Sequence, residues 1–187
     1  MPEIEVHPVT PDRWADLERL AGGAGFFSGC WCMWWRLTNQ ELSGQSAADA
    51  RAALERLVAE GRQPGLLGYR GGEPVGWVAV APRDEYRRIA RTQKLQPVDD
   101  RPAWAVVCFY VHRDHRRAGV AAALLAAAVE HARAHGAELV EGYPVDSSGG
   151  KRVSGARQGT GRLEMFERAG FAEVARRGDR PIVRRRP

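Results

Sequence analysis

The chain has 187 residues, of which 44% are hydrophobic and 27% charged, as in a globular protein with a substantial core. Its net charge of +5 is compatible with a polyanionic partner or with a solvated arginine-rich surface, and no nucleic-acid-binding motif accompanies it. No apolar run reaches the ~18–20 residues that cross a bilayer, and the N-terminal segment lacks a signal-peptide core. We therefore expect a cytoplasmic protein with neither a membrane nor a nucleic-acid partner.

The three cysteines are odd in number and too few for a disulfide scaffold. Cys30 and Cys32 form a C-x-C pair, and neighbours this close rarely bridge without strain. A zinc site would need about four ligands, and no second C-x-C or H-x-x-H cluster is present. We therefore expect no metal, and we interpret these cysteines as packing residues or free thiols.

The N-terminal third predicts a strand, a helix and a dense aromatic segment. Residues 2–8 alternate apolar and polar, which favours a strand. A helix should begin near Thr10, as its cap, with Pro11 in the first turn, and end at Gly22. The following stretch, FFSGCWCMWWRL, has two interpretations. Its aromatic side chains either pack in the core or form the wall of a substrate pocket. The pocket wall would be formed by Phe27, Trp31, Trp34 and Trp35.

The middle of the chain predicts a helix and then a hairpin. Ser46 and Asp49 match a capping box in its acidic form, at the start of a helix whose apolar stripe includes Leu54 and Val58. Residues 65–82 form two apolar runs around an R-G-G-E turn, which is typical of a β-hairpin. We expect a short helix and a loop in the polar, proline-bounded stretch that follows.

The C-terminal half predicts alternating strands and helices. Residues 103–111 are apolar on both faces, as in a central strand covered on both sides. An alanine-rich helix over 118–135 and a buried strand over 138–145 follow. The remaining elements are a flexible loop over 146–161, a short helix ended by Gly170, and strands around 171–176 and 181–185.

The stretch RRAGVA at residues 116–121 stands where the central strand turns into the alanine-rich helix. The first N–H groups of a helix have no internal partner, and the helix dipole adds positive charge there, so phosphate groups bind readily. Gly119 lacks the Cβ that would hold a phosphate away, while Arg116 and Arg117 add positive charge. Because neither G-x-x-x-x-G-K-[ST] nor G-x-G-x-x-G occurs, an NTPase loop and a dinucleotide fold are disfavoured.

The segment YVHRDHRRAGVAAALLAAAVEHARAHG resembles the acyl-coenzyme A binding motif of the GNAT (Gcn5-related) N-acetyltransferases, Q/R-x-x-G-x-G/A. Arg116, Gly119 and Ala121 match that motif, and MFERAGFAEV is similar to the family's Y-x-x-x-G-F segment. The resemblance implies the GNAT fold, of class α/β (α+β). Its central mixed, mostly antiparallel sheet would have about six to seven strands and about four flanking helices, in a single domain over residues 1–187.

The resemblance also implies an activity and a cofactor. The expected reaction transfers an acetyl or other acyl group from acetyl-CoA to a primary amine of a small molecule or peptide. The amine would attack the thioester directly, and no metal would take part. A homodimer is left open. The coenzyme A contacts would be backbone groups or side chains of Phe109, Tyr110, Val111, Arg116, Arg117, Ala118, Gly119, Val120 and Ala121.

The acid and base of the reaction are where the sequence departs from the family. Phe166 stands where the family usually has a proton-donating tyrosine, and PAWA replaces the early glutamate of the central strand. The candidates to replace them are Glu141, Tyr143 and Tyr110. In the alternative interpretations Glu141 is an arginine partner, the tyrosines are core residues, and water relays move the protons.

Three other functions stay open from the sequence. Phe166 favours a catalytically silent coenzyme A-binding or sensor domain. A carrier-protein thioester could replace coenzyme A as the donor and meet the basic residues Arg113 and Arg116. The arginine-rich tail could bind nucleic acid, in which case the affinity would fall steeply with salt.

Overall fold

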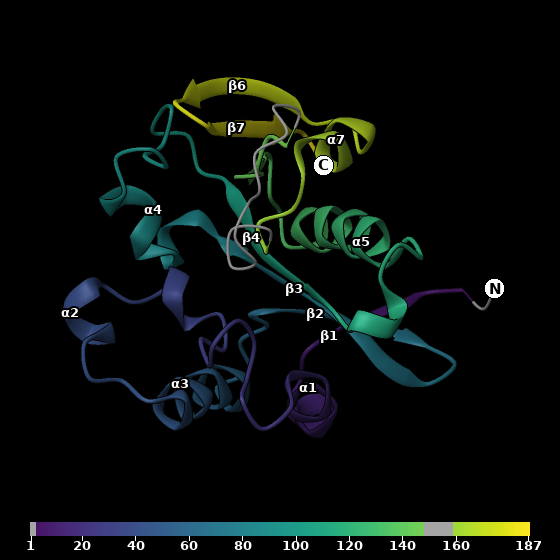
Figure 1. The fold of residues 1–187 in the computed structure, drawn as a ribbon. Helices are drawn as coiled ribbons and strands as arrows, with labels where there is room; N and C mark the ends of the chain where they lie inside the picture. The colour runs from purple at the N-terminus through teal and green to yellow at the C-terminus, as the bar shows by residue number, and fades with distance from the viewer. Residues whose placement is uncertain (1–2, 148–158) are drawn as a thin grey trace.

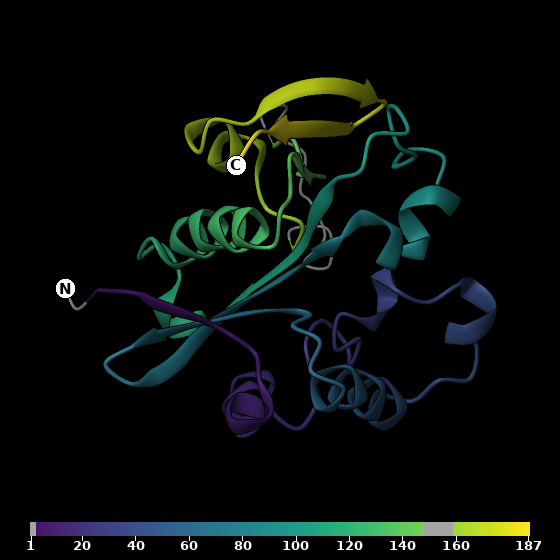
Figure 2. The same ribbon diagram turned by 180° about the vertical axis from the view of Figure 1, so that it is seen from behind.

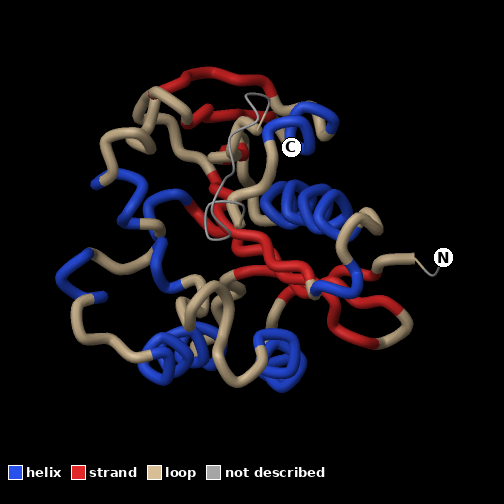
Figure 3. Tube along the Cα trace, in the orientation of Figure 1, coloured by secondary structure: helices blue, strands red, loops and turns tan. Residues whose placement is uncertain are grey.

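A seven-stranded sheet forms the centre of the computed structural model, which describes residues 3–147 and 159–187 (Figures 1 and 3). The strand order is β1-β2-β3-β4-β5-β7-β6, and only the β4–β5 pair is parallel. The predicted mixed, mostly antiparallel sheet is therefore confirmed. The strands are β1 (Glu5–Pro8), β2 (Gly65–Arg70), β3 (Glu73–Pro82), β4 (Trp104–Val111), β5 (Val140–Gly142), β6 (Ala172–Arg177) and β7 (Arg180–Arg185).

Helices cover both faces of the sheet (Figures 1 and 2). Two of them, α1 (Trp14–Ala21) and α3 (Ala47–Ala59), lie on one face, and α5 (Val120–Ala134) lies on the other beside α7 (Leu163–Arg168). These four correspond to the flanking helices expected from the sequence. The described residues add two short helices, α2 (Asn39–Leu42) and α4 (Arg87–Arg91), beside the first face. None of the described helices is both long and apolar enough to span a bilayer.

The sheet separates two hydrophobic cores, because successive side chains of a strand point to opposite faces. In β3, Trp77 packs with α1 and α3 while Val78 packs with α5, and neither is exposed to solvent. In β4, Val106 and Val107 divide between the two cores in the same way. The prediction that β4 is a central strand covered on both sides is confirmed.

Local signals in the sequence account for several element ends. The Ser46–Asp49 capping box forms: the Asp49 N–H donates to Ser46 Oγ at 3.2 Å, and the Ser46 N–H donates to Asp49 Oδ2 at 2.9 Å. Thr10 and Pro11 take the predicted places at the start of this helical segment, but the Thr10 side chain makes no capping hydrogen bond. Its hydroxyl accepts from the Arg13 guanidinium at 3.0 Å, and a 3₁₀ turn over Pro11–Arg13 opens the helix instead.

Two predicted elements are shorter than expected, for reasons that bear on the site. The helix α5 begins at Val120 rather than at 118, because Gly119 takes a left-handed φ of 78°. The strand β5 covers three residues, since the chain leaves β4 after Gly142. The predicted flexible loop falls largely on residues 148–158, which lie outside the described residues.

Candidate functional site

The turn between β4 and α5 presents a row of free backbone N–H groups. Arg117 and Gly119 both have left-handed φ values, 61° and 78°, which turn the chain sharply into the helix. Among the residues that the structure describes, none accepts a backbone hydrogen bond from any N–H between Arg117 and Ala122. This row contains the N–H groups predicted for the pyrophosphate, and it has the geometry of an anion site at a helix N-terminus.

Arginines hold the turn in place and add positive charge around it. Arg116 Nε donates to the carbonyl of Val111 at 3.3 Å, and Arg70 at the end of β2 donates to the carbonyl of Ala118 at 3.0 Å. Nothing lies within 4 Å of the position that a Cβ on Gly119 would take. The outer side of the turn is thus open to a ligand, while its inner side is fixed to the sheet.

A notch opens between β4 and β5 beside the turn. The two strands pair only from Trp104–Val140 to Val106–Gly142, so among residues 3–147 and 159–187 no strand pairs with the rest of β4 on that side. The Phe109 N–H points to this free edge and donates to the carbonyl of Gly159 at 2.5 Å. Within the described residues, the segment at Gly159 therefore already contacts one of the groups predicted to bind pantetheine.

The alternation of backbone groups along β4 narrows the predicted pantetheine contacts. The backbone groups of successive residues in a strand point to opposite edges. The Phe109 N–H points to the free edge and the His112 N–H donates to Val75 of β3, so the backbone groups of Val111 point to the free edge and those of Tyr110 point to β3. The expectation that Tyr110 offers its backbone to the ligand is therefore corrected. Phe109 and Val111 remain the two backbone candidates on this strand.

Phe166, which takes the place of the family's tyrosine, lies at the closed end of the notch. Its ring is fully buried, with the ring of Phe109 6.1 Å away and that of Phe171 5.1 Å away, between centroids. A Cβ on Gly142 would collide with this ring, so β5 approaches it closely. The position supplies an apolar wall and no proton.

Glu141 belongs to a buried network of ion pairs. Its Oε2 accepts from Arg184 Nε at 2.6 Å and from Arg83 at 3.2 Å, and its Oε1 accepts from the hydroxyl of Tyr143. Arg184 also binds both carboxylate oxygens of Asp99, at 2.7 and 3.0 Å. The interpretation of Glu141 as an arginine partner is the one that this geometry supports.

Tyr143 is closed off in the same network. Burial, reinforced by the Glu141 carboxylate, raises the pKa of its hydroxyl well above the ordinary value. The side-chain hydrogen bonds from Arg184 lower the pKa of Asp99, which keeps the outer member of the network ionised. The network therefore joins β5 and β7 to the segments around residues 83 and 99, and it exposes no proton at the notch.

Tyr110 lies apart from Glu141 and Tyr143. Glu141 pairs with Ala105, so Tyr110 stands five residues farther along β4, roughly 16 Å away along the strand. Its half-buried ring packs against Phe26, 4.9 Å away, and Phe27, 6.0 Å away between centroids. The structure therefore does not bring the three predicted catalytic residues together.

The aromatic segment divides between core and surface. Trp31 is buried against Trp14 and Phe26, with ring centroids 6.1 and 5.8 Å away, and Trp35 is buried against Tyr143 at 6.3 Å. Core packing is thus the correct interpretation for both tryptophans. Trp34 is 39% exposed, with the Arg88 guanidinium 4.0 Å from its ring centroid. Phe27 is half-buried beside Tyr110, so the exposed part of the predicted pocket wall reduces to Phe27 and Trp34.

The backbone of this segment is held in an uncommon shape. Four residues other than glycine have left-handed φ values, a conformation that side chains with a Cβ rarely adopt. Nearby, Trp77 Nε1 donates to Cys32 Sγ at 3.1 Å, while the Cys108 thiol and burial raise the pKa of Cys32 well above its ordinary value. All three cysteines are free. The left-handed residues are Phe27 (35°), Ser28 (66°), Trp31 (43°) and Cys32 (56°).

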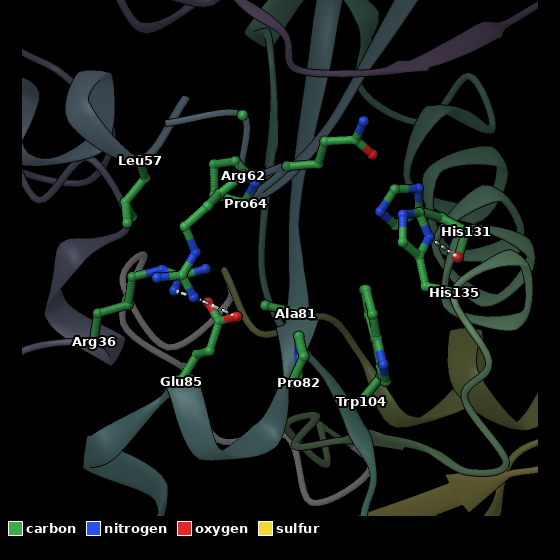
Figure 4. A pocket seen from close by; sticks show the side chains of 12 residues that line it. Arg36, Leu57, Arg62, Pro64, Ala81, Pro82, Glu85, Trp104, His131 and His135 are labelled. Atoms are coloured by element: carbon green, nitrogen blue, oxygen red, sulfur yellow. Dashed lines mark hydrogen bonds and ion pairs between the residues drawn. The ribbon is translucent and has the colours of Figure 1, made fainter. Parts of the chain in front are cut away.

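A separate cavity of about 300 Å³ lies at the opposite end of β4, beside Trp104 (Figure 4). His131 and His135 line one wall, and Arg62 and Glu85 line the facing wall, ion-paired to each other at 2.6 Å. Burial, and then the neighbouring His135, lower the pKa of His131 to about 4. The sequence gives no local signal for this cavity, because its lining comes from segments far apart in the chain.

Comparisons with known proteins agree with this arrangement. The family model described as the Acetyltransferase (GNAT) family matches residues 31–147. No curated protein sequence matches the chain. A solved structure described as a GNAT-family acetyltransferase, from Desulfovibrio desulfuricans, has a TM-score of 0.56 at 19% identity and covers 98% of this chain and 99% of its own.

Two further solved structures show the same fold. The PaiA N-acetyltransferase of Thermoplasma acidophilum, in complex with coenzyme A, has a TM-score of 0.55 at 11% identity and covers 99% of both chains. The ribosomal-protein-alanine N-acetyltransferase of Brucella melitensis has a TM-score of 0.54 at 16% identity, covering 98% of this chain and 99% of its own. With a family model that spans more than half of its length, this chain belongs to the GNAT acetyltransferase family.

Proposed function

We propose that the protein transfers an acetyl group from acetyl-CoA to a primary amine of a small molecule or peptide. The amine attacks the thioester carbon directly, the C–S bond breaks, and coenzyme A leaves as its thiol after the amine has lost a proton. The observation that carries this proposal is the row of free N–H groups from Arg117 to Ala122, in a member of an acetyltransferase family. One structural neighbour was solved with coenzyme A bound, which supports the choice of donor.

The turn residues fit a pyrophosphate in charge and in shape. The N–H groups from Arg117 to Ala121 would donate to the phosphate oxygens, and Arg116 and Arg117 would offset their charge. The open space around Gly119 leaves room for the phosphates against the backbone. The pantetheine would then run along the free edge of β4, at the Val111 N–H and the Phe109 carbonyl, since the Phe109 N–H already donates to Gly159.

Tyr110 is the proton donor that we propose for the leaving thiolate. It stands at the notch, its ring is half-buried, and no described residue is hydrogen-bonded to its hydroxyl. Phe166 has no proton to give, and Glu141 has its carboxylate committed to two arginines and a tyrosine. Water at the notch would accept the proton of the attacking amine.

The acceptor would approach from the face that carries the aromatic segment. Phe27 beside Tyr110 offers apolar and π surface to an amine, whereas the Trp34 ring already holds the Arg88 guanidinium 4.0 Å from its centroid. A protonated amine is attracted to such rings before it loses its proton. A small, partly apolar amine or a peptide N-terminus therefore fits this wall better than a polyamine does.

Calorimetric titration with acetyl-CoA, followed by thiol release against a panel of primary amines, tests the proposal. We expect micromolar binding and a release rate that rises with amine concentration. Binding with no release for any amine in the panel would favour the silent coenzyme A-binding domain that Phe166 suggests. Absence of binding to acetyl-CoA would contradict the assignment of the turn.

A further inference from the structure

The turn between β4 and α5 is contacted from the sheet side by an arginine of a distant strand. Arg70, the last residue of β2, donates from Nη2 to the carbonyl of Ala118 at 3.0 Å, across 48 residues of sequence. The β2–β3 hairpin ends beside this turn (Figures 1 and 2). Since Gly68 faces Leu124 of α5 and side chains alternate along a strand, Arg70 faces α5 as well.

Two glycines of the hairpin let the start of α5 lie close to the sheet. A Cβ on Gly76 would be 2.7 Å from Val120 Cγ1, and a Cβ on Gly68 would be 3.2 Å from Leu124 Cδ2. A larger residue at Gly76 would therefore push the first turn of α5 away from β3. Because both positions are glycine, the backbone of the turn is within reach of the last side chain of β2.

The hydrogen bond from Arg70 fixes the direction of one peptide group in the turn. The C=O and N–H groups of a trans peptide point in opposite directions. The Ala118 carbonyl points inward to Arg70, so the Gly119 N–H of the same peptide points to the open outer side. Reversal of this peptide would bring a carbonyl oxygen to the place proposed for the pyrophosphate. Glycine adopts positive and negative φ about equally, so Gly119 does not itself prevent that reversal.

Arg70 also carries a positive charge that no described carboxylate pairs with. Its Nε is buried and has no hydrogen-bond partner among the residues that the structure describes. Glu73, which is opposite Arg70 in the hairpin, is ion-paired to Arg19 of α1 at 3.7 Å. Because charges that are partly removed from water are usually paired, the unpaired guanidinium favours an anionic ligand at this turn.

We propose that Arg70 is a positioning residue of the coenzyme A site, which holds the peptide between Ala118 and Gly119 with its N–H towards the pyrophosphate. The identity of the ligand rests on the proposed function, whereas the orientation of the peptide does not. If only about a tenth of the molecules kept this orientation, the affinity for the ligand would fall about tenfold, because the others could not bind it.

Calorimetric titration of Arg70 variants with acetyl-CoA tests the effect on binding. Arg70→Met keeps the apolar stem without the guanidinium and should weaken binding by about tenfold or more. Arg70→Lys keeps the charge, but its ammonium ends one bond short of the Nη2 position, so binding should also weaken, by about threefold or more. Arg19→Met removes a positive charge from α1, on the other face of the sheet, and should leave the affinity unchanged.

An NMR comparison of the ligand-free proteins tests the orientation of the peptide directly. The distance between Ala118 Hα and the Gly119 amide proton depends on which way this peptide points, and the nuclear Overhauser effect between the two protons reports that distance. We expect this effect to change in Arg70→Met and to stay the same in Arg19→Met.

Three results would overturn the proposal. They are unchanged acetyl-CoA affinity in Arg70→Met, an unchanged nuclear Overhauser effect in that variant, and full affinity in Arg70→Lys, which would show that charge alone acts. If Arg70→Met fails to fold, Arg70→Lys, which keeps the stem and the charge, decides by both measurements. If the wild-type protein does not bind acetyl-CoA, the proposed function fails, whereas the NMR comparison still decides whether Arg70 orients the peptide.

Discussion

Polar groups are unpaired at one end of β4 and fully paired at the other. Beyond Val111, the turn into α5 leaves a row of N–H groups open to solvent, with no partner among the described residues. Near Ala105, the carboxylate of Glu141 is fully buried and accepts from two arginines and a tyrosine. Unpaired groups at an accessible turn are free to bind a ligand, whereas paired groups in the interior hold strands together.

The contrast predicts different roles for the two ends of the strand: residues at the open end bind a ligand, and residues at the paired end stabilise the fold. Substitutions at the open end should change ligand affinity with little effect on folding. Substitutions at the paired end should change folding first. The following variants test that separation, from the largest expected effect to the smallest.

Glu141→Ala should have the largest effect, on stability. The substitution leaves Arg184 and Arg83 without their buried carboxylate, and removing one partner of a buried ion pair costs about 3–5 kcal/mol. Urea unfolding measures this loss. Glu138→Ala, at an exposed position, is the matched control and should change the free energy of unfolding by less than about 0.5 kcal/mol. A loss below about 1 kcal/mol for Glu141→Ala would show that the network does not stabilise the fold.

Gly119→Glu should weaken acetyl-CoA binding by about 1,000-fold, or roughly 4 kcal/mol. The glutamate places a side chain and a negative charge where the pyrophosphate is proposed to lie, and it strains a φ of 78°. Calorimetric titration with acetyl-CoA measures the change in affinity.

Gly136→Glu is the control for this variant. Gly136 follows the other end of α5, with a φ of 79° and equally open surroundings. The same strain and charge there should leave the affinity unchanged. Equal losses in the two variants would mean that backbone strain explains the effect, and not a side chain in the place proposed for the pyrophosphate.

Tyr110→Phe should reduce turnover by about 100-fold, the lower end of the range for a general acid, and leave the acetyl-CoA dissociation constant unchanged. Thiol-release kinetics with saturating acetyl-CoA measure the effect. Tyr69→Phe removes a hydroxyl that donates to Asp16 at 2.8 Å and should not alter turnover. Full activity in Tyr110→Phe would assign proton transfer to water alone.

The pH dependence of stability should show the smallest effect. The pKa of His131 is about 4 in the folded protein and 6.5 as its ordinary value, so folding disfavours its protonated form. The neutral His131 side chain therefore contributes fully to the free energy of unfolding above pH 6.5, and this contribution is lost as the pH falls towards 4. We expect a loss of about 1 kcal/mol, reduced by solvent because the ring is only partly buried. Urea unfolding over this pH range measures the loss, and His131→Phe should flatten this part of the profile.

The sequence predicted most of the architecture because periodicity and capping signals are local. The apolar run of β4, the Ser46–Asp49 box and the RRAGVA turn each depend on neighbouring residues. The length of β5 could not be predicted in this way, because a strand ends where its partner diverges. Its end at Gly142 follows from the pairing with Val106.

The candidate site was predicted only in part, for a similar reason. The turn proposed to bind phosphate lies within six consecutive residues, so its sequence signal is local. The partners of Glu141 come from positions 83, 143 and 184, and no local pattern joins an acid to arginines that far away. The composition of the aromatic segment does not determine which of its side chains are buried. The burial of Trp31 and Trp35 and the exposure of Trp34 therefore could not be predicted from the sequence.

The left-handed residues of the aromatic segment set limits on how its sequence can change. At Phe27, Ser28 and Cys32 a branched residue such as valine would worsen the backbone strain, whereas glycine or asparagine would relieve it. Trp31 has the same backbone constraint and is also buried in the core, so two demands act on one position. The segment is irregular in structure, yet backbone conformation and burial together restrict which residues it can accept.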